Sequence, residues 1–282
     1  MTEVSSAYRA YRAWVTEPLS SPPAVSVVIP AYNEEWRILP TIGAIATHMS
    51  AREQPWELII ADDGSTDSTV SLVRDLRFAN LRLLVAEKNA GKGDAVRRGM
   101  LAARGQVVLF ADADQSTPIE QYDRLAALLD HDFDVVVGSR AVEGADVSGK
   151  SMGRRILSAG LHLLVSRGFG VEVADTQCGF KLFTAGAAKK LFSTQLVDGF
   201  SFDLEVLYLA HKFGFRTAEV PVEWIDAPGS TVDAAKVSLQ FVRDLMRIRL
   251  YDLRGRYQEM SPTHPLGSTP VPFDKIDRGT QS

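Results

Sequence analysis

The sequence has a single cysteine among its 282 residues, Cys178, so the chain cannot close a disulfide bond within itself. No cysteine and histidine spacing suggests a zinc site, and a reducing compartment, the cytoplasm, is therefore expected.

Long apolar runs are also missing. The longest, residues 25–29 and 156–165, fall far short of the roughly 20 residues that a membrane-spanning helix requires. The start of the chain has no secretory signal, so we expect neither export nor a spanning anchor.

An excess of basic charge is missing too. The chain has 31 lysines and arginines against 35 aspartates and glutamates, a formal net charge of -4, which argues against a general nucleic-acid binder. The content of 45% hydrophobic and 23% charged residues excludes disordered and collagen-like chains. What remains is a globular protein that is large enough to bury a sizeable core.

Short apolar runs alternate with helix-like stretches, which predicts an α/β fold with a mostly parallel, Rossmann-like sheet flanked by helices. The expected strands are residues 25–29, 57–61, 81–86, 107–111 and 134–138. The expected helices are residues 36–49, a segment after the cap signal at 65–67, residues 92–104 and residues 119–129. The expected organisation is an N-terminal arm (1–23), an α/β domain (24–232), a basic amphipathic helix (233–260) and a flexible tail (261–282).

Acidic residues follow two of these strands, at the sheet edge where α/β proteins bind ligands. Asp112 and Asp114 come directly after an apolar strand, and such a pair suits Mg²⁺ or Mn²⁺ shared with substrate phosphates. A capped turn is the alternative interpretation. Asp62 and Asp63 end another strand, where a carboxylate can accept hydrogen bonds from a nucleobase or ribose. Glycines around Lys92 open a helix, which favours the approach of a phosphate, although the spacing is not that of a P-loop.

Taken together, the segments PAYNEE, DDGSTD, NAGKG and DAD, in this order, resemble the inverting family 2 glycosyltransferases of the GT-A fold. Four later segments, VVVGSRAVEG, DTQCGFKLF, GFSFDLE and VPVEWIDAPGS, are similar to the dolichyl-phosphate β-glucosyltransferase branch and to polyprenyl-phosphate glycosyltransferases more widely. The resemblance covers residues 25–249.

The resemblance implies a role for particular residues. Those expected to hold the base and ribose of a nucleotide sugar, or to lie near it, are Pro30, Tyr32, Asn33, Glu34, Asp62, Asp63 and Lys92. Asp112 is expected to lie against both ribose and metal, and Asp114 to bind Mg²⁺ or Mn²⁺ at the diphosphate. The metal neutralises charge on the departing nucleoside diphosphate.

The acceptor that the resemblance implies is a lipid phosphate, which is largely ionised at neutral pH because its second pKa is about 6. Such an acceptor needs cations rather than a general base. Residues 140–167 carry five basic and two acidic residues, and Arg154 and Ser158 are spaced to share a helix face. By resemblance, Arg140, Arg154 and Ser158 bind this phosphate; a solvated basic surface is the alternative.

Asp203 lies among phenylalanines, where a carboxylate acquires a raised pKa or a firm partner. By resemblance it lies near the sugar or the acceptor and is the base if the acceptor is a hydroxyl; a carboxylate at a helix N-terminus is the alternative. Gln177 and Lys181 receive no role. Trp224 either supports the sugar or belongs to the core.

Residues 236–256 predict a basic amphipathic helix with Leu245 and Ile248 on its apolar stripe. This helix either lies in a bilayer interface or packs on the domain. Residues 156–165 and the aromatic residues Tyr8, Tyr11 and Trp14 are further candidates for membrane contact, and the latter three can instead pack on the domain. We therefore expect a peripheral protein on the cytoplasmic face of a membrane.

The sequence thus predicts the transfer of a hexose, expected to be glucose from UDP-glucose, to a polyprenyl or dolichyl phosphate with Mg²⁺ or Mn²⁺. One alternative has GDP-mannose as the donor, because the same motifs occur with UDP and GDP donors. Another has a soluble or glycan hydroxyl as the acceptor and Asp203 as the base. A third is a nucleotide-sugar-binding module without turnover, against which the Asp112 and Asp114 pair argues.

Overall fold

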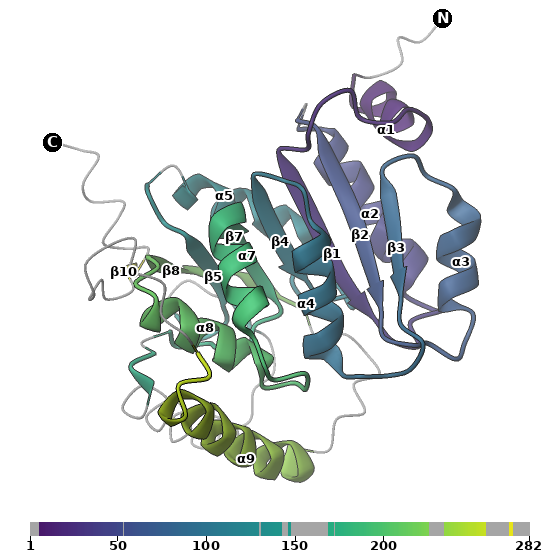
Figure 1. The fold of residues 1–282 in the computed structure, drawn as a ribbon. Coiled ribbons are helices and arrows are strands. Elements are labelled where there is room, and N and C mark those ends of the chain that lie inside the picture. The colour runs from purple at the N-terminus through teal and green to yellow at the C-terminus, as the bar shows by residue number, and fades with distance from the viewer. Residues whose placement is uncertain are drawn as a thin grey trace, which may run out of the picture.

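The computed structural model describes residues 6–52, 54–129, 131–142, 146–147, 169–171, 173–225, 234–257 and 271–272. They form a twisted sheet with helices on both faces (Figure 1). The strand order is β10-β8-β5-β7-β4-β1-β2-β3, and every neighbouring pair is parallel except the two that β7 makes with β4 and β5. A mostly parallel sheet flanked by helices confirms the predicted fold class.

The strands of this sheet are β1 (Val25–Ala31), β2 (Trp56–Asp62), β3 (Leu81–Val85), β4 (Val107–Ala111), β5 (Val135–Ser139), β7 (Phe180–Thr184), β8 (Thr217–Pro221) and β10 (Val271–Pro272). A separate two-stranded sheet pairs β6 (Asp146–Val147) with β9 (Glu223–Trp224). The helices are α1 (Ser6–Thr16), α2 (Ile38–Ser50), α3 (Thr69–Leu76), α4 (Lys92–Ala102), the 3₁₀ turn η1 (Ile119–Gln121), α5 (Tyr122–Leu129), α7 (Ala185–Thr194), α8 (Phe202–Lys212) and α9 (Ala234–Leu253).

Two apolar cores lie on opposite faces of the large sheet. Val28 and Phe110 pack with α4, α7 and α8 on one face, whereas Ile29 and Leu109 pack with α2 and α5 on the other. Because both faces are covered, the central strands are apolar at nearly every position instead of alternating with polar residues. This is why the strands are visible in the sequence as short continuous apolar runs.

All five expected strands and all four expected helices are present, with ends that shift by a few residues. Of the described elements after β5, the helix α9 was predicted, as the basic amphipathic helix, whereas β7, α7, α8 and β10 were not predicted. The most consequential of them is β7, which runs antiparallel between β4 and β5 and pairs Lys181 with Phe110 and Phe180 with Ala111. The amino end of β7 therefore lies beside the carboxyl end of β4, where Asp112 follows.

The N-terminal arm contains α1, which packs on the domain through Trp14. The indole ring of Trp14 stacks on that of Trp56 with centroids 4.2 Å apart, and its Nε1 donates to the Trp56 carbonyl oxygen at 3.0 Å. Tyr11 is partly buried against the same core, whereas Tyr8 is exposed. Of the two interpretations of these aromatic residues, packing on the domain is the one that holds for Trp14 and Tyr11.

The C-terminal helix α9 packs against α8. Leu245 and Ile248, which the sequence places on the apolar stripe, are buried in the core, so this stripe faces the domain. Asp244 accepts a hydrogen bond from Ser201 Oγ at 2.7 Å, which ties α9 to the start of α8. Within the predicted tail, Val271–Pro272 pairs with β8 as β10. None of the helices in the described part of the chain is long and apolar enough to cross a membrane.

Candidate active site

The loops after β1 and β2 are joined by hydrogen bonds. Asn33 takes a positive φ of 55°, a conformation that asparagine tolerates better than most residues. Its backbone N–H donates to Ser65 Oγ at 2.9 Å, and its Oδ1 accepts from the Thr66 N–H at 2.9 Å. The Glu34 N–H donates to Thr69 Oγ1 at 2.8 Å. The PAYNEE and DDGSTD segments therefore form one rigid unit at the edge of the sheet.

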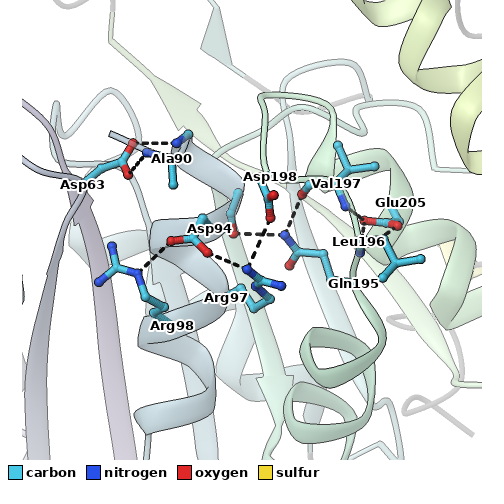
Figure 2. A network of polar contacts seen from close by, with 12 residues as sticks. Asp63, Ala90, Asp94, Arg97, Arg98, Gln195, Leu196, Val197, Asp198 and Glu205 are labelled. Atoms are coloured by element: carbon cyan, nitrogen blue, oxygen red, sulfur yellow. Dashed lines mark hydrogen bonds and ion pairs between the residues drawn. The ribbon is translucent and has the colours of Figure 1, made fainter. Parts of the chain in front are cut away.

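Asp62 and Asp63 are buried and accept hydrogen bonds from backbone amides. The Asp62 carboxylate accepts from the N–H groups of Gly64 and Ser65, at 3.0 and 3.1 Å. The Asp63 carboxylate accepts from Ala90 and Gly91, at 2.8 and 2.9 Å, and so links this unit to the start of α4 (Figure 2). A carboxylate has about four acceptor positions, so binding of a base or ribose stays a prediction for both residues.

The other residues expected at the donor differ in exposure. Tyr32 is exposed and Pro30 is buried. Glu34 makes an ion pair with Arg37, with 2.7 Å between Oε2 and Nε. Burial raises the pKa of Glu34 above its usual range, although Arg37 acts in the opposite direction. These residues belong to the loop unit and remain predicted donor contacts.

The two aspartates after β4 are both partly open to solvent. The Asp112 N–H donates to the Gly179 carbonyl oxygen at 2.9 Å, and Lys92 Nζ lies 2.7 Å from Asp112 Oδ1. Asp114 Oδ1 accepts the Ser116 N–H at 2.9 Å, as the capped-turn interpretation expects, and its other oxygen takes no part in that bond. Two hard oxygen donors one residue apart match the way Mg²⁺ or Mn²⁺ binds beside phosphates.

A second ion pair lies deeper, between β7 and α8. Lys181 is 1% exposed, and its Nζ donates to Asp203 Oδ1 at 2.5 Å and to the Cys178 carbonyl oxygen at 2.6 Å. Asp203 lies in the first turn of α8 and is 4% exposed. Burial raises the pKa of Asp203, and the ammonium groups of Lys181 and Lys92 oppose that shift. Asp203 thus has both the raised pKa and the firm partner that its sequence position suggests.

Lys92, Lys181, Asp112 and Asp203 form a charge cluster around the ring of Phe110. The two ammonium nitrogens lie 5.6 and 5.9 Å from the centroid of that ring, Lys92 being the nearer. Burial acts to lower the pKa of Lys92, but Asp112 and Asp203 outweigh it and the pKa is raised. Lys92 therefore remains a cation beside the acidic strand end, where it can meet a diphosphate.

The start of α4 is covered by the segment that leads into α8 (Figure 2). A Cβ at Gly91 would lie 2.4 Å from the Asp198 carbonyl oxygen, and one at Gly93 would lie 2.7 Å from that of Val197. Gln195 Nε2 donates to the carbonyl oxygens of Gly93 and Val197, at 2.9 and 2.8 Å. Close backbone packing explains the absence of side chains at these glycines, and the approach of a phosphate to the start of α4 stays a prediction.

Glu205, which shares a segment with Asp203, has a structural role. Its carboxylate accepts the N–H groups of Leu196 and Val197, at 3.0 and 2.8 Å, and the hydroxyl of Tyr257 at 2.5 Å. These bonds fix the segment before α8 and the turn after α9 to the same helix, α8. Of the two acidic residues in GFSFDLE, Asp203 alone faces the charge cluster.

Arg140, a predicted acceptor ligand, is already paired. Its Nε and one terminal nitrogen bind the two carboxylate oxygens of Asp175, at 2.6 and 2.9 Å. Burial acts to lower the pKa of Arg140, but Asp175 raises it well above the usual range, and Asp112 adds a smaller effect. Trp224 lies with its ring 5.6 Å from the guanidinium carbon, beside the site rather than in the core. The other two predicted phosphate ligands, Arg154 and Ser158, lie outside the described residues.

Three residues of the site had no predicted role: Asp175, Gly179 and Lys181. All belong to the segment DTQCGFKLF, which supplied the resemblance without assigning them. One local signal could have indicated a role for Lys181. It lies in the middle of an apolar run, and a buried ammonium group needs a polar partner.

Comparisons with known proteins identify the family of the chain. The model of Glycosyl transferase family 2 matches residues 26–192. The dolichyl-phosphate beta-glucosyltransferase of Dictyostelium discoideum is 37% identical over 246 residues, which cover 82% of this chain and 75% of that protein. The enzyme of that name from Saccharomyces cerevisiae is 37% identical over 257 residues, which cover 83% of this chain and 77% of that protein. The human protein of that name is 34% identical over 250 residues, which cover 83% of this chain and 77% of that protein.

Solved structures show the same fold. Glucosyl-3-phosphoglycerate synthase from Mycobacterium tuberculosis in complex with UDP superposes with a TM-score of 0.60 at 20% identity, over 88% of this chain and 86% of that one. The same synthase with Mn²⁺, UDP and glucosyl-3-phosphoglycerate gives 0.56 at 19% identity, over 99% and 98%. The sheet and these neighbours together define a fold of the GT-A type. The chain belongs to glycosyl transferase family 2.

The position of the Asp112 carboxylate depends on Gly179, because a Cβ at that residue would lie 2.0 Å from Asp112 Oδ2. We expect Gly179→Ala to lower the rate of sugar transfer about 100-fold, since a displacement of about 1 Å at a reacting centre has effects of that size. Initial rates and melting temperatures of the purified variant measure this.

Gly186→Ala is the matched control, because a Cβ at Gly186 would meet nothing within 4 Å. It should transfer sugar at the wild-type rate. If Gly179→Ala also kept its rate to within about twofold, the position of Asp112 would not matter for catalysis.

Proposed function

We propose that this glycosyltransferase moves glucose, with inversion, from UDP-glucose to a polyprenyl or dolichyl phosphate, and that it uses Mg²⁺ or Mn²⁺. The names of the relatives support both the sugar and the acceptor. The observation that carries the proposal is the charge cluster together with Asp114. Asp112 and Asp114 lie at the sheet edge, whereas Asp203 is ion-paired with Lys181 within the protein. Such a site is built to hold a diphosphate and does not offer a free base.

The donor is expected to bind along the rigid loop unit after β1 and β2, with Tyr32 and Asn33 nearest to solvent. Solved neighbours of the same fold hold UDP, and one of them holds Mn²⁺ as well, which supports a uridine donor. In this arrangement the Lys92 ammonium group lies where it can accept part of the charge of the diphosphate as the bond to the sugar breaks.

The metal is expected to bind to Asp112 and Asp114. Both side chains are partly exposed at the end of one strand, and carboxylate oxygens are the donors that Mg²⁺ and Mn²⁺ prefer. When bound, the ion would supply Lewis-acid neutralisation of the nucleoside diphosphate. The protein itself positions the two carboxylates. The backbone of Gly179, directly before β7, holds Asp112, and the turn at Ser116 holds Asp114.

The state of Asp203 supports a phosphate acceptor over a hydroxyl. A general base must reach the proton that it removes, and Asp203 is 4% exposed with one oxygen held by Lys181. A phosphate that is already ionised needs no such base. Among the described residues, Arg140 is a cation that we propose as a ligand of the acceptor phosphate. Arg154 and Ser158 are proposed as further ligands of this phosphate.

Attachment to a membrane surface is proposed for the outer face of α9. Met246, Leu250 and Leu253 are exposed at a spacing of four and three residues, so they form one stripe. Arg243, Arg247 and Arg254 are exposed as well and fall at three- or four-residue spacing from that stripe. An apolar stripe bordered by arginines is typical of helices that lie in an anionic bilayer surface.

The decisive test is transfer of labelled sugar from UDP-glucose into an organic-extractable product with polyprenyl phosphate and Mn²⁺. We expect label in the lipid phase with Mn²⁺, and none with a chelator or with Asp114→Ala. GDP-mannose is run in parallel. Label from GDP-mannose alone would contradict the donor, and donor consumption with all label in the aqueous phase would contradict the acceptor.

For the outer face of α9, sedimentation with vesicles of phosphatidylglycerol and phosphatidylcholine is the measurement. The double variant Met246→Asp, Leu250→Asp should bind about tenfold more weakly, because it removes apolar area and adds negative charge. Leu101→Asp, which alters an exposed leucine on α4, is the control and should bind as the wild type does. If the wild type, the double variant and Leu101→Asp sedimented equally with the vesicles, the outer face of α9 would not be the membrane-binding surface.

A further inference from the structure

Lys181 is a charged side chain in the centre of the large sheet. It lies on β7 with Phe110 of β4 on one side and Val137 of β5 on the other, and it is 1% exposed. Burying an ammonium group carries a large desolvation cost, which is offset only when partners are close and well oriented. A methionine would fill similar space without that cost. The stability of the fold alone therefore gives no reason for a lysine here.

The partners of Lys181 point to the reacting site. Of its three N–H donors, one binds the Cys178 carbonyl oxygen at 2.6 Å and one binds Asp203 Oδ1 at 2.5 Å. The charges that face Asp203 are Lys181 from β7, Lys92 from α4 and Asp112 from the end of β4. Asp203 is thus the link between the buried lysine and the acidic strand end.

One strand sets the position of both carboxylates. The Gly179 carbonyl oxygen, directly before β7, accepts the Asp112 N–H at 2.9 Å. Two residues further along, Lys181 holds Asp203. Any shift of β7 would move both acidic groups together, because both are fixed to it by hydrogen bonds.

We propose that Lys181 is a positioning residue for sugar transfer, which holds the carboxyl group of Asp203 in its orientation beside Lys92 and Asp112. It acts through Asp203 and does not itself touch the substrate. The proposal rests on the proposed function for the identity of donor and acceptor. It deepens that function because it assigns the positioning of Asp203 to Lys181, a residue that is not among the proposed ligands of the nucleotide, the metal or the phosphate.

Four variants test the proposal: Lys181→Met, Lys181→Arg, Asp203→Asn and the double variant Lys181→Met, Asp203→Asn. Each is measured for kcat, for the KM of UDP-glucose and of polyprenyl phosphate, and for its melting temperature. The double variant removes both buried charges. It should fold even if Lys181→Met alone does not, since an uncompensated buried charge destabilises far more than the loss of a whole pair.

A positioning role predicts that Lys181→Met and Asp203→Asn each lower kcat about tenfold or more, with the KM of UDP-glucose changed less than about threefold. The double variant should regain the melting temperature but not kcat, and should be no slower than the slower single variant. Lys181→Arg, which keeps the charge, should recover part of kcat.

Two results would overturn the proposal. If the double variant regained both stability and kcat, Lys181 would serve the fold alone. If the two single losses multiplied in the double variant, Lys181 would act independently of Asp203. A wild-type protein that leaves polyprenyl phosphate unlabelled would instead refute the proposed acceptor. The four variants would then be compared by release of UDP from UDP-glucose without lipid, with the same pattern expected.

Discussion

The antiparallel pairing of β7 with β4 is the constraint on which the site depends. In an all-parallel sheet, the carboxyl end of a neighbouring strand would lie beside the carboxyl end of β4. Here the amino end of β7 lies there instead. That reversal places Gly179 against Asp112, with no room for a side chain between them, and it places Lys181 beneath Phe110. The acidic edge of the sheet is therefore held from the side by a strand that belongs to the second half of the chain.

Around this pairing, charges are balanced in two layers. Lys92 and Asp112 meet at the surface, where both are partly exposed, and Lys181 and Asp203 meet in the interior. Because the outer pair is accessible, Lys92 can bind a diphosphate in place of Asp112, and Asp112 can bind a divalent ion in place of Lys92. The inner pair is excluded from water, where the attraction between opposite charges is stronger. The cluster thus combines a fixed inner support with an outer layer that is open to ligands.

The sequence predicted the first half of the fold well, because strands buried on both faces leave continuous apolar runs and their loops carry recognisable acidic and glycine signals. It predicted Asp112 and Asp114 at one edge for the same reason. It did not predict β7, since FKLFT interrupts the apolar run with a lysine. It did not predict that Arg140 would pair with Asp175, and it left open whether Leu245 and Ile248 face the core, because these contacts join segments far apart in the chain. Partnership between distant side chains is not encoded in local patterns.

Under the proposed function, Asp112 and Asp114 at the end of β4 would hold a metal ion beside the diphosphate of a nucleotide sugar. Calorimetric titration of UDP into the protein, with and without Mn²⁺, tests it most directly. We expect Mn²⁺ to strengthen UDP binding about tenfold or more, a common size for coupling between two ligands, and Asp112→Asn to abolish the difference. Equal affinity for UDP with and without Mn²⁺ in the wild-type protein would contradict it.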